Sequence, residues 1–490
     1  MTTKEANVQG AVAHIQSADT SKQLTGAMAR PINVTFVGAG SMFCPILARD
    51  VLLIPGAERG EIRLIDTDAS RLKTVHTIIE KLLKPIGHTD GWKIKSSTNR
   101  EDLLAGSDYV ICSVEVSGLQ CVGWDNDIPL KYGIDQCIGD TIGPGGLFKG
   151  LRTVPVFLDI LRDMARLCPR AIMLNYTNPM NMMCLAAGRA VPQVPVIGLC
   201  HSVQGTSKQM AARVGIDVKD IDWECAGINH LAWFTKFQHK GQDLYPRLMK
   251  QAQAEVYGNK DDSDNANPED KDQDIVRKDM MLHFGAFITE GSGHLSEYLP
   301  YYRKSEAGKK YWRPGYGGES RFYASNWPKW RADGEVVREK MVRGEEQFDL
   351  NRSWEHASWI IEAREKDTPI TVHGNVMNTP GISDPNRADS HPLITNLPHN
   401  GCVEVACTID KRGITPEHYG KLPPQMAHLC ASNMAMFDLA ANAAIEKSKD
   451  AAIHALLLDP LCAAILTPAE IKRMALELFE AEKDFLPGYR

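Results

Sequence analysis

Short apolar runs alternate with segments of helical periodicity over the first 200 residues of the chain. Residues 32–37, 61–66, 108–114 and 171–175 are rich in β-branched and other aliphatic side chains, and helix-compatible segments separate them. Residues 151–168 have apolar positions at helical spacing. Strands that alternate with helices are typical of a parallel sheet, so we predict a Rossmann-like, doubly wound α/β fold for this part.

The turn after the first apolar run is rich in glycine, and the second run ends in an acidic residue. In such a unit the glycines let the backbone approach a pyrophosphate, and the acidic residue binds ribose hydroxyls. Asp66 in this place, rather than an arginine, favours NAD over NADP. Phe43 stands where the third glycine is usual, which indicates a modified fingerprint. The predicted cofactor-binding residues are Gly38, Gly40, Ser41, Asp66 and Asn99.

The pattern changes near residue 222. Residues 223–234 are typical of antiparallel strands, and the last 70 residues are mostly helical. We therefore predict an N-terminal extension (1–30), an NAD-binding domain (31–222) and a C-terminal α+β domain (223–490) for substrate and metal. This arrangement is similar to that of lactate and malate dehydrogenases. Residues 260–274 are strongly acidic without the spacing of a calcium loop, which predicts a solvated surface insertion.

Composition excludes several function classes. The chain has 490 residues, a formal net charge of −6 and 24% charged residues, so no broad basic surface suggests a nucleic-acid or membrane partner. Its 12 cysteines include no Cys-x-x-Cys pair, which favours reduced thiols and a cytoplasmic location. We recognise no signal peptide and no apolar run long enough to span a bilayer.

Polar side chains with metal-binding chemistry follow the later strands. The apolar run 196–199 ends in Cys200 and His201, and His230 stands early in the next segment. Ligands collect at the carboxyl ends of parallel strands, and thiolate and imidazole suit a borderline divalent metal. By itself, a Cys-His pair is more often a buried structural cysteine beside a surface histidine.

Four motifs occur together and in the order of one known family. They are Gly38-Ala39-Gly40-Ser41, Asn175-Tyr176-Thr177-Asn178-Pro179, Cys200-His201-Ser202-Val203 and Gly227-Ile228-Asn229-His230. In these motifs the chain resembles glycoside hydrolase family 4. Asn396-Leu397-Pro398 with Val403-Glu404-Val405 is similar to the C-terminal signature of that family. The resemblance covers roughly residues 32–445.

The resemblance implies a glycosidase that needs NAD⁺ and a divalent metal, usually Mn²⁺, and that stands outside the two-carboxylate mechanisms. In this family hydride leaves C3 of the sugar for NAD⁺, and the resulting ketone acidifies the proton at C2, which a base removes. The group at C1 is eliminated, water adds, and the ketone is reduced again. The cofactor is thus recycled with no net redox change.

The resemblance also implies roles for individual binding residues. Cys200 and His230 match the metal ligands, and Asn178 matches a residue that contacts the sugar hydroxyls. Arg152 lies in a segment similar to one at the family's active site. It could hold a substrate hydroxyl or form a salt bridge, and the sequence leaves both open.

The catalytic proton carriers are inferred in the same way. His201 follows the metal-binding cysteine, where some members have an acid, and is the candidate for protonating the leaving group. Tyr298, in a Tyr-Leu-x-Tyr-Tyr stretch, matches the C2 base of several members, and His294 is the alternative base.

The residues after Cys200 bear on the substrate. His201-Ser202-Val203 resembles the α-galactosidases and lacks the Asn and Pro that accompany 6-phosphorylated substrates. An α-glucoside or an α-uronide stays open, because sequence cannot place the cation that a uronate needs. A hydroxyacid dehydrogenase and a non-catalytic NAD-binding sensor are the rival classes. The resemblance further suggests a homodimer or homotetramer acting on a small glycoside.

Overall fold

The structure is a computed structural model that describes residues 24–258, 274–380 and 391–490. Most of the expected N-terminal extension and nearly all of the acidic segment 260–274 lie outside the described residues. None of the helices within these three ranges is both long and apolar enough to cross a membrane.

The first part of the chain forms a parallel sheet between two layers of helices. Its strands are β1 (Ile32–Val37), β2 (Gly60–Ile65), β3 (Trp92–Ser97), β4 (Tyr109–Cys112), β5 (Ile172–Asn175) and β6 (Val196–Gly198). Its helices are α1 (Cys44–Leu52), α2 (Ala69–Ile86), α3 (Glu101–Leu104), α4 (Leu119–Lys131), α5 (Gly143–Leu167) and α6 (Met180–Ala190). The strand order β3-β2-β1-β4-β5-β6 confirms the predicted doubly wound fold, with its reversal between β1 and β4.

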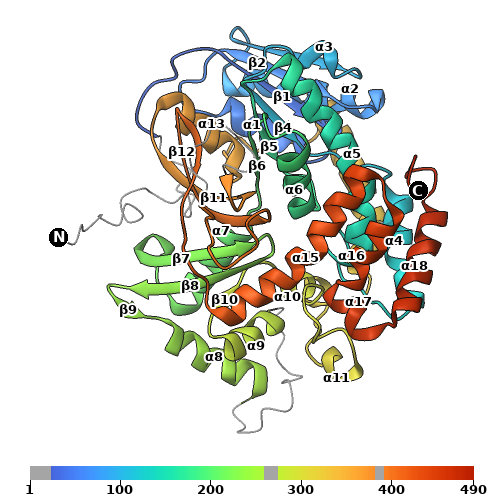
Figure 1. The fold of residues 1–490 in the computed structure, drawn as a ribbon. Coiled ribbons are helices and arrows are strands. Elements are labelled where there is room, and N and C mark those ends of the chain that lie inside the picture. Colours follow the sequence, from blue (N-terminus) through green and yellow to red (C-terminus); the bar gives the residue numbers. More distant parts are fainter. Residues whose placement is uncertain (1–23, 259–273, 381–390) are drawn as a thin grey trace.

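Burial on both faces explains the apolar runs of this sheet. Every residue of β4 and β5 is buried, because α1 lies on one side of the strands and α5 and α6 lie on the other (Figure 1). The sequence placed five of the six strands to within two residues and missed β3, and α5 begins at Gly143, well before the expected residue 151. A proline in the first turn of α5 suits a helix start, and the apolar periodicity alone missed it.

The second part of the chain, from residue 202 on, adds antiparallel strands and the remaining α-helices of the described residues. Its strands are β7 (Ile221–Ile228), β8 (Leu231–His239), β9 (Gln242–Asp243), β10 (Phe287–Ile288), β11 (Ile370–Met377), β12 (Cys402–Asp410) and β13 (Gly413–Pro416). Its helices are α7 (Ser202–Val214), α8 (Tyr245–Tyr257), α9 (Ile275–Phe284), α10 (Ser292–Leu295), α11 (Glu306–Lys309), α12 (Phe322–Arg343), α13 (His356–Lys366), α15 (Pro424–Glu446), α16 (Lys449–Leu457), α17 (Pro460–Ile465) and α18 (Pro468–Ala481).

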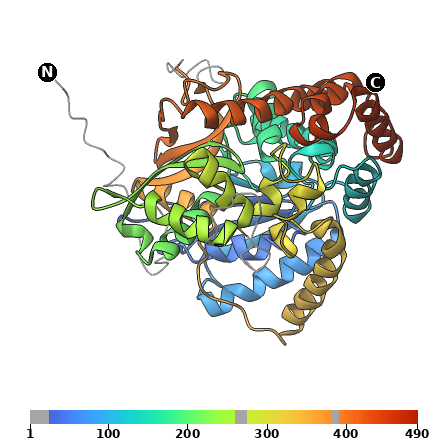
Figure 2. The same cartoon turned by 90° about the horizontal axis from the view of Figure 1, so that it is seen from below.

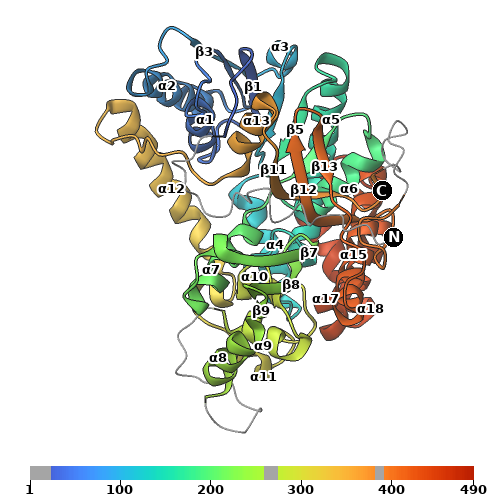
Figure 3. The ribbon, with the colours of Figure 1, turned by 90° about the vertical axis from the view of Figure 1, so that its left-hand side faces the viewer.

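One sheet runs through both parts. β11 pairs antiparallel with β6, β12 pairs with β11, and β7 pairs with β12 (Figure 3). A line of paired residues, Gly198, Asn375, Glu404 and Gly227, therefore joins the end of β6 to the end of β7. The domain boundary at residue 222 remains a prediction, since the sheet continues across it.

Candidate active site

The glycine turn after β1 approaches the strand beside it closely. Gly38 has φ +83°, and a Cβ atom on it would lie 2.4 Å from the carbonyl oxygen of Ser113. Both features require glycine. The backbone N–H of Gly40 donates to Asp66 Oδ2 at 2.7 Å, so the carboxylate at the end of β2 also braces the turn. The Ser41 hydroxyl accepts from the N–H of Cys44 at the start of α1.

Four of the five predicted cofactor residues, all but Gly40, line two adjacent cavities. Gly38, Asp66 and Asn99 line a cavity of ≈ 560 Å³, which we call the turn cavity. Ser41 lines a second cavity of ≈ 370 Å³, the bridging cavity, and Val114 and Glu115 line both. The side chain of Phe43 packs edge-on against Tyr176 with ring centroids 5.2 Å apart. The large residue at the third glycine position thus becomes a wall of the bridging cavity.

Cys200, His230 and Glu290 form a cluster of possible metal ligands. The Cys200 Sγ lies 3.4 Å from His230 Nε2, and Glu290 Oε2 lies 3.2 Å from the same nitrogen. One ligand atom from each of the three side chains lies within 4.8 Å of the other two. Among the residues that the structure describes, this is the one group of three such side chains. The structure thus brings the two predicted ligands together and adds a third.

The backbone positions this cluster through close packing and unusual conformations. A Cβ atom on Gly198 would lie 2.5 Å from Met180 Sδ, so only glycine allows β6 to pack this closely against α6. This packing positions Cys200, which follows the strand. His230, in the turn between β7 and β8, has φ 64°, and Glu290 has φ 72°. Non-glycine residues in this region cost of order 1–3 kcal/mol and concentrate at functional sites.

The cluster opens into a third cavity of ≈ 410 Å³, the thiol cavity. Cys200, His201, His230, Glu290 and His294 line it. It shares four lining residues with the bridging cavity, namely Phe43, Asp140, Tyr176 and Asn178. The glycine turn and the thiol–imidazole cluster therefore lie at two ends of one series of adjacent cavities.

Asn178 contacts a partly buried carboxylate that the sequence did not single out. Its Nδ2 donates to Asp140 Oδ2 at 3.3 Å, and Lys149 Nζ lies 3.6 Å from the same oxygen. Burial alone would raise the pKa of Asp140, but Lys149 and His294 hold it below its ordinary value. An ionised carboxylate and an amide side by side suit hydrogen bonds with sugar hydroxyls.

Tyr298 and His294, the two candidate bases, differ in their position relative to the thiol cavity. The Tyr298 side chain is fully buried, and its hydroxyl lies 3.5 Å from His230 Nδ1. Burial, followed by the charges of Asp140 and Glu290, raises its pKa well above the ordinary value. Tyr298 thus lies behind His230, whereas His294 lines the thiol cavity with its Nδ1 3.8 Å from Glu290 Oε1.

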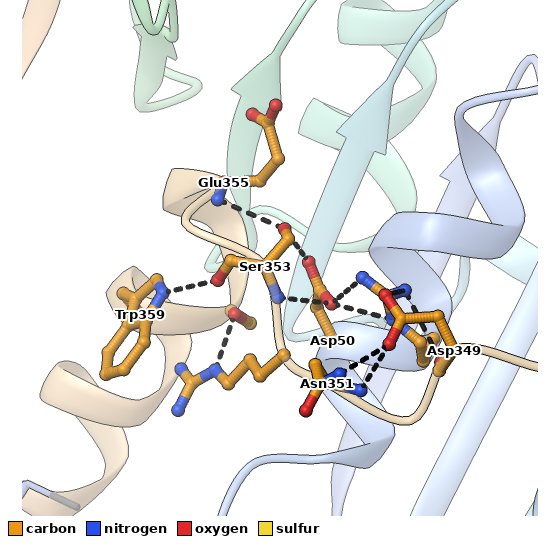
Figure 4. A network of polar contacts seen from close by, with 9 residues as sticks. Asp50, Asp349, Asn351, Ser353, Glu355 and Trp359 are labelled. Carbon is orange, nitrogen blue, oxygen red and sulfur yellow. Dashed lines mark hydrogen bonds and ion pairs between the residues drawn. The ribbon is translucent and has the colours of Figure 1, made fainter. Parts of the chain in front are cut away.

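His201 is exposed at the start of α7 and faces Glu355. Its Nδ1 lies 3.7 Å from Glu355 Oε1. Figure 4 shows how that glutamate is held: its backbone N–H donates to the Ser353 hydroxyl, and the Ser353 backbone N–H donates to the buried Asp50. The Trp359 indole N–H donates to the Ser353 carbonyl oxygen. Segments far apart in the sequence thus hold the backbone of Glu355, which places its carboxylate beside His201.

Arg152 lies apart from these cavities. Its side chain is buried in α5 and forms ion pairs with Asp125, at 2.7 Å, and with Glu482 after α18. It is not among the residues that line the three cavities. Of the two alternatives that the sequence left open, the structure shows the salt bridge.

Glu290, Asp140 and Glu355 are site residues that sequence reasoning missed. For Glu290 a signal existed, because it closely follows an apolar run ending at Ile288, as Cys200 follows another. Asp140 and Glu355 lie in segments without strand-end patterns, and only tertiary contacts bring them to the site.

Comparison with known proteins shows the family of the chain. The model of the family 4 glycosyl hydrolases matches residues 33–216, and that of the family 4 glycosyl hydrolase C-terminal domain matches residues 225–462. The chain belongs to family 4 of the glycosyl hydrolases.

Individual relatives span nearly the whole chain. An α-galactosidase of Bacillus subtilis (strain 168) is 36% identical over 93% of this chain and 99% of its own length. An α-galacturonidase of Lachnoclostridium phytofermentans is 26% identical over 93% and 97%. The 6-phospho-β-glucosidase from Thermotoga maritima, solved with manganese, NAD⁺ and glucose-6-phosphate, is 21% identical and has a TM-score of 0.73 over 93% and 99% of the chains. That last likeness shows the fold.

Proposed function

We propose that this chain is an NAD⁺- and Mn²⁺-dependent α-galactosidase. One observation carries the proposal: a thiol, an imidazole and a carboxylate converge at the far end of cavities that begin at a dinucleotide-type glycine turn. Membership in a glycosyl hydrolase family favours this function over a hydroxyacid dehydrogenase or a non-catalytic sensor. Its α-galactosidase relative supports the choice of sugar.

The chemistry of the cluster fits a divalent cation. Cys200, His230 and Glu290 offer sulfur, nitrogen and oxygen ligands, a mixed set that suits a borderline metal. Burial, together with the charges of Glu404 and Glu290, raises the pKa of the Cys200 thiol. A cation between these side chains would offset that repulsion and favour the thiolate. When bound, NAD⁺ accepts a hydride and the metal stabilises negative charge on sugar oxygens.

The side chains around the cavity supply binding and proton transfer. Asn178 and Asp140 would hold sugar hydroxyls at the junction of the bridging and thiol cavities. His294 would take the proton from C2, since it lines the thiol cavity, whereas Tyr298 would orient the His230 ring through its hydroxyl. His201, oriented by Glu355, would donate a proton to the glycosidic oxygen.

The lining of the thiol cavity favours a neutral sugar. Among the described residues around it, neither Lys nor Arg occurs. A uronate or a 6-phosphate would need such a cation for a charge-assisted hydrogen bond. The adjoining bridging cavity has three such cations. Lys149 is paired with Glu115 at 3.0 Å and with Asp140, and Arg71 is paired with Glu335. Arg331 lies near Gly118 rather than at the thiol cavity. An α-galactoside therefore fits better than an α-galacturonide.

A panel of nitrophenyl α-glycosides tests the proposal. With NAD⁺, Mn²⁺ and a thiol reductant, we expect the α-galactoside to be hydrolysed faster than the α-glucoside and the α-galacturonide. In D₂O, deuterium should appear at C2 of the released sugar, because that proton exchanges during elimination. Hydrolysis that persists without NAD⁺ or after EDTA treatment, or a product without deuterium at C2, would contradict the mechanism. Faster cleavage of the galacturonide would overturn the choice of sugar alone.

A further inference from the structure

Helix α12 belongs to the second part of the chain but lies against the glycine turn of the first. Figures 2 and 3 show it side by side with α2, at the edge of the molecule. Arg338 Nη1 donates to the carbonyl oxygen of Gly40 at 2.7 Å, and Arg71 on α2 pairs with Glu335 at 2.9 Å. These contacts hold α12 in a defined position over the turn.

The face of α12 that meets the turn is closely packed and lines the bridging cavity. A Cβ atom on Gly334 would lie 1.9 Å from Met42 Sδ, so glycine lets the helix touch the turn directly. Trp327, Trp330 and Arg331 line the bridging cavity together with Ser41. The helix is thus a wall of this cavity, opposite the start of α1.

Three guanidinium groups meet at this contact. Arg71 and Arg338 pair with the carboxylate of Glu335, whereas Arg331 has Glu335, Glu115 and Asp68 only as nearby charges. Arg331 makes no hydrogen bond or ion pair with any residue in the described part of the chain. Burial, followed by the charge of Arg71, lowers its pKa, although the nearby carboxylates act in the opposite direction. An anion beside the guanidinium would favour its charged form further.

The guanidinium of Arg331 lies near the wall that faces the turn. A Cβ atom on Gly118 would lie 3.2 Å from Arg331 Nη1. Glu115, the nearby acid of that wall, is paired with Lys149 at 3.0 Å. A dinucleotide running from Asp66 toward Cys200 must pass from the turn cavity through the bridging cavity, and its pyrophosphate normally crosses the start of the first helix.

We propose that Arg331 binds the pyrophosphate of NAD⁺, so that α12 completes a cofactor site whose other wall is the glycine turn. The inference rests on the proposed use of NAD⁺. Backbone N–H groups at the start of α1 would face the phosphates from one side, and the planar guanidinium would face them from the other. It adds a cofactor-binding residue that lies outside the strand–turn–helix unit.

Equilibrium binding without metal or sugar tests this role independently of catalysis. The metal-free protein is titrated with NAD⁺, ADP-ribose and adenosine, by calorimetry and by intrinsic tryptophan fluorescence. We expect Arg331→Gln to weaken NAD⁺ and ADP-ribose alike, by about 10- to 100-fold, which is typical for loss of a hydrogen bond to a charged group. Adenosine, which has no phosphate, should bind as tightly to the variant as to the wild type.

A matched control and a conservative variant complete the test. Lys329→Gln removes an exposed cation from the same helix and should leave all three affinities unchanged. If Arg331→Gln does not fold, Arg331→Lys should still weaken NAD⁺ and ADP-ribose relative to adenosine, because lysine lacks the planar fork. Unchanged NAD⁺ affinity in a folded Arg331 variant, or an equal loss for adenosine, would overturn the inference alone. A wild type that binds neither NAD⁺ nor ADP-ribose would overturn the proposed function as well.

Discussion

His230 and Glu290 illustrate how single residues are held for function at a cost in stability. Both have a left-handed backbone conformation, and neither is a glycine or an asparagine. The β7–β8 turn and the loop after β10 keep them there, and their side chains meet 3.2 Å apart. The histidine ring has both nitrogens engaged, Nδ1 with Tyr298 and Nε2 with the cluster. Such an outer contact fixes the tautomer of a ligating histidine.

Metal binding should depend on each member of the cluster. Cys200→Ser and Glu290→Gln should weaken Mn²⁺ binding by more than the ~10–100-fold that loss of an outer-shell partner costs. The free Mn²⁺ signal in electron paramagnetic resonance measures this directly. Cys168→Ser, which changes a buried cysteine at the end of α5, should leave Mn²⁺ affinity unchanged. If Glu290→Gln bound Mn²⁺ as tightly as the wild type, Glu290 would not be a metal ligand, whereas the roles of Cys200 and His230 would be unaffected.

At the scale of single elements, side chains that cap helix ends help to specify the fold. Asp459 caps α17: its Oδ1 accepts from the N–H groups of Leu461 and Cys462, at 3.1 and 2.8 Å. The side chain is fully buried, and Oδ2 has no hydrogen-bond partner among the described residues. Burial raises the pKa of Asp459 from 3.8 to about 6, although the two N–H groups act in the opposite direction.

This raised pKa predicts a pH-dependent stability. The folded state binds the Asp459 proton more tightly than the unfolded state. Its contribution to the free energy of unfolding is therefore complete below about pH 4 and is lost as pH rises through about 6. Relative to Asp459→Asn, which keeps the acceptor but does not titrate, the free energy of unfolding should fall by up to about 3 kcal/mol from pH 4 to pH 7. Urea unfolding at several pH values measures the difference. A difference that does not change with pH would show that Asp459 has an ordinary pKa.

In the assembled chain the two halves are not independent. β11 covers the edge of β6, α13 packs against α1, and α12 packs against α2. Removing the second half would expose the β6 edge and the apolar surfaces beneath these helices. A strand edge uncovered in this way promotes aggregation.

A fragment of residues 24–222 should therefore fail to fold on its own. We expect low solubility, binding of a hydrophobic dye and no cooperative thermal unfolding, whereas the full chain expressed in parallel unfolds cooperatively. Circular dichroism during heating provides the measurement. A fragment that melts cooperatively and binds NAD⁺ would instead establish the boundary at residue 222 as that of an autonomous domain.

Much of this protein follows from local sequence patterns. Apolar runs, helical spacing and glycine turns are short-range signals, so they predict five of the six parallel strands, their alternation with helices and the dinucleotide-type turn. The polar strand β3 has no such apolar run and was missed. Cys200 and Asn178 could be predicted as site residues from the same short-range signals, since each follows a strand and parallel strands end at one edge. His230 was found through a motif of the family, because its turn has no such pattern.

Other features arise only when distant segments meet. β11 and β12 insert between β6 and β7 and thereby set the distance between Cys200 and His230. Glu290, Glu355 and α12 lie at the site although they are distant from the glycine turn in the sequence. Arg152 lies away from the site because its side chain is paired with Asp125 and Glu482. Periodicity records which face of a segment is apolar, but not which segment covers it. Packing and charge pairing between remote elements determine that choice.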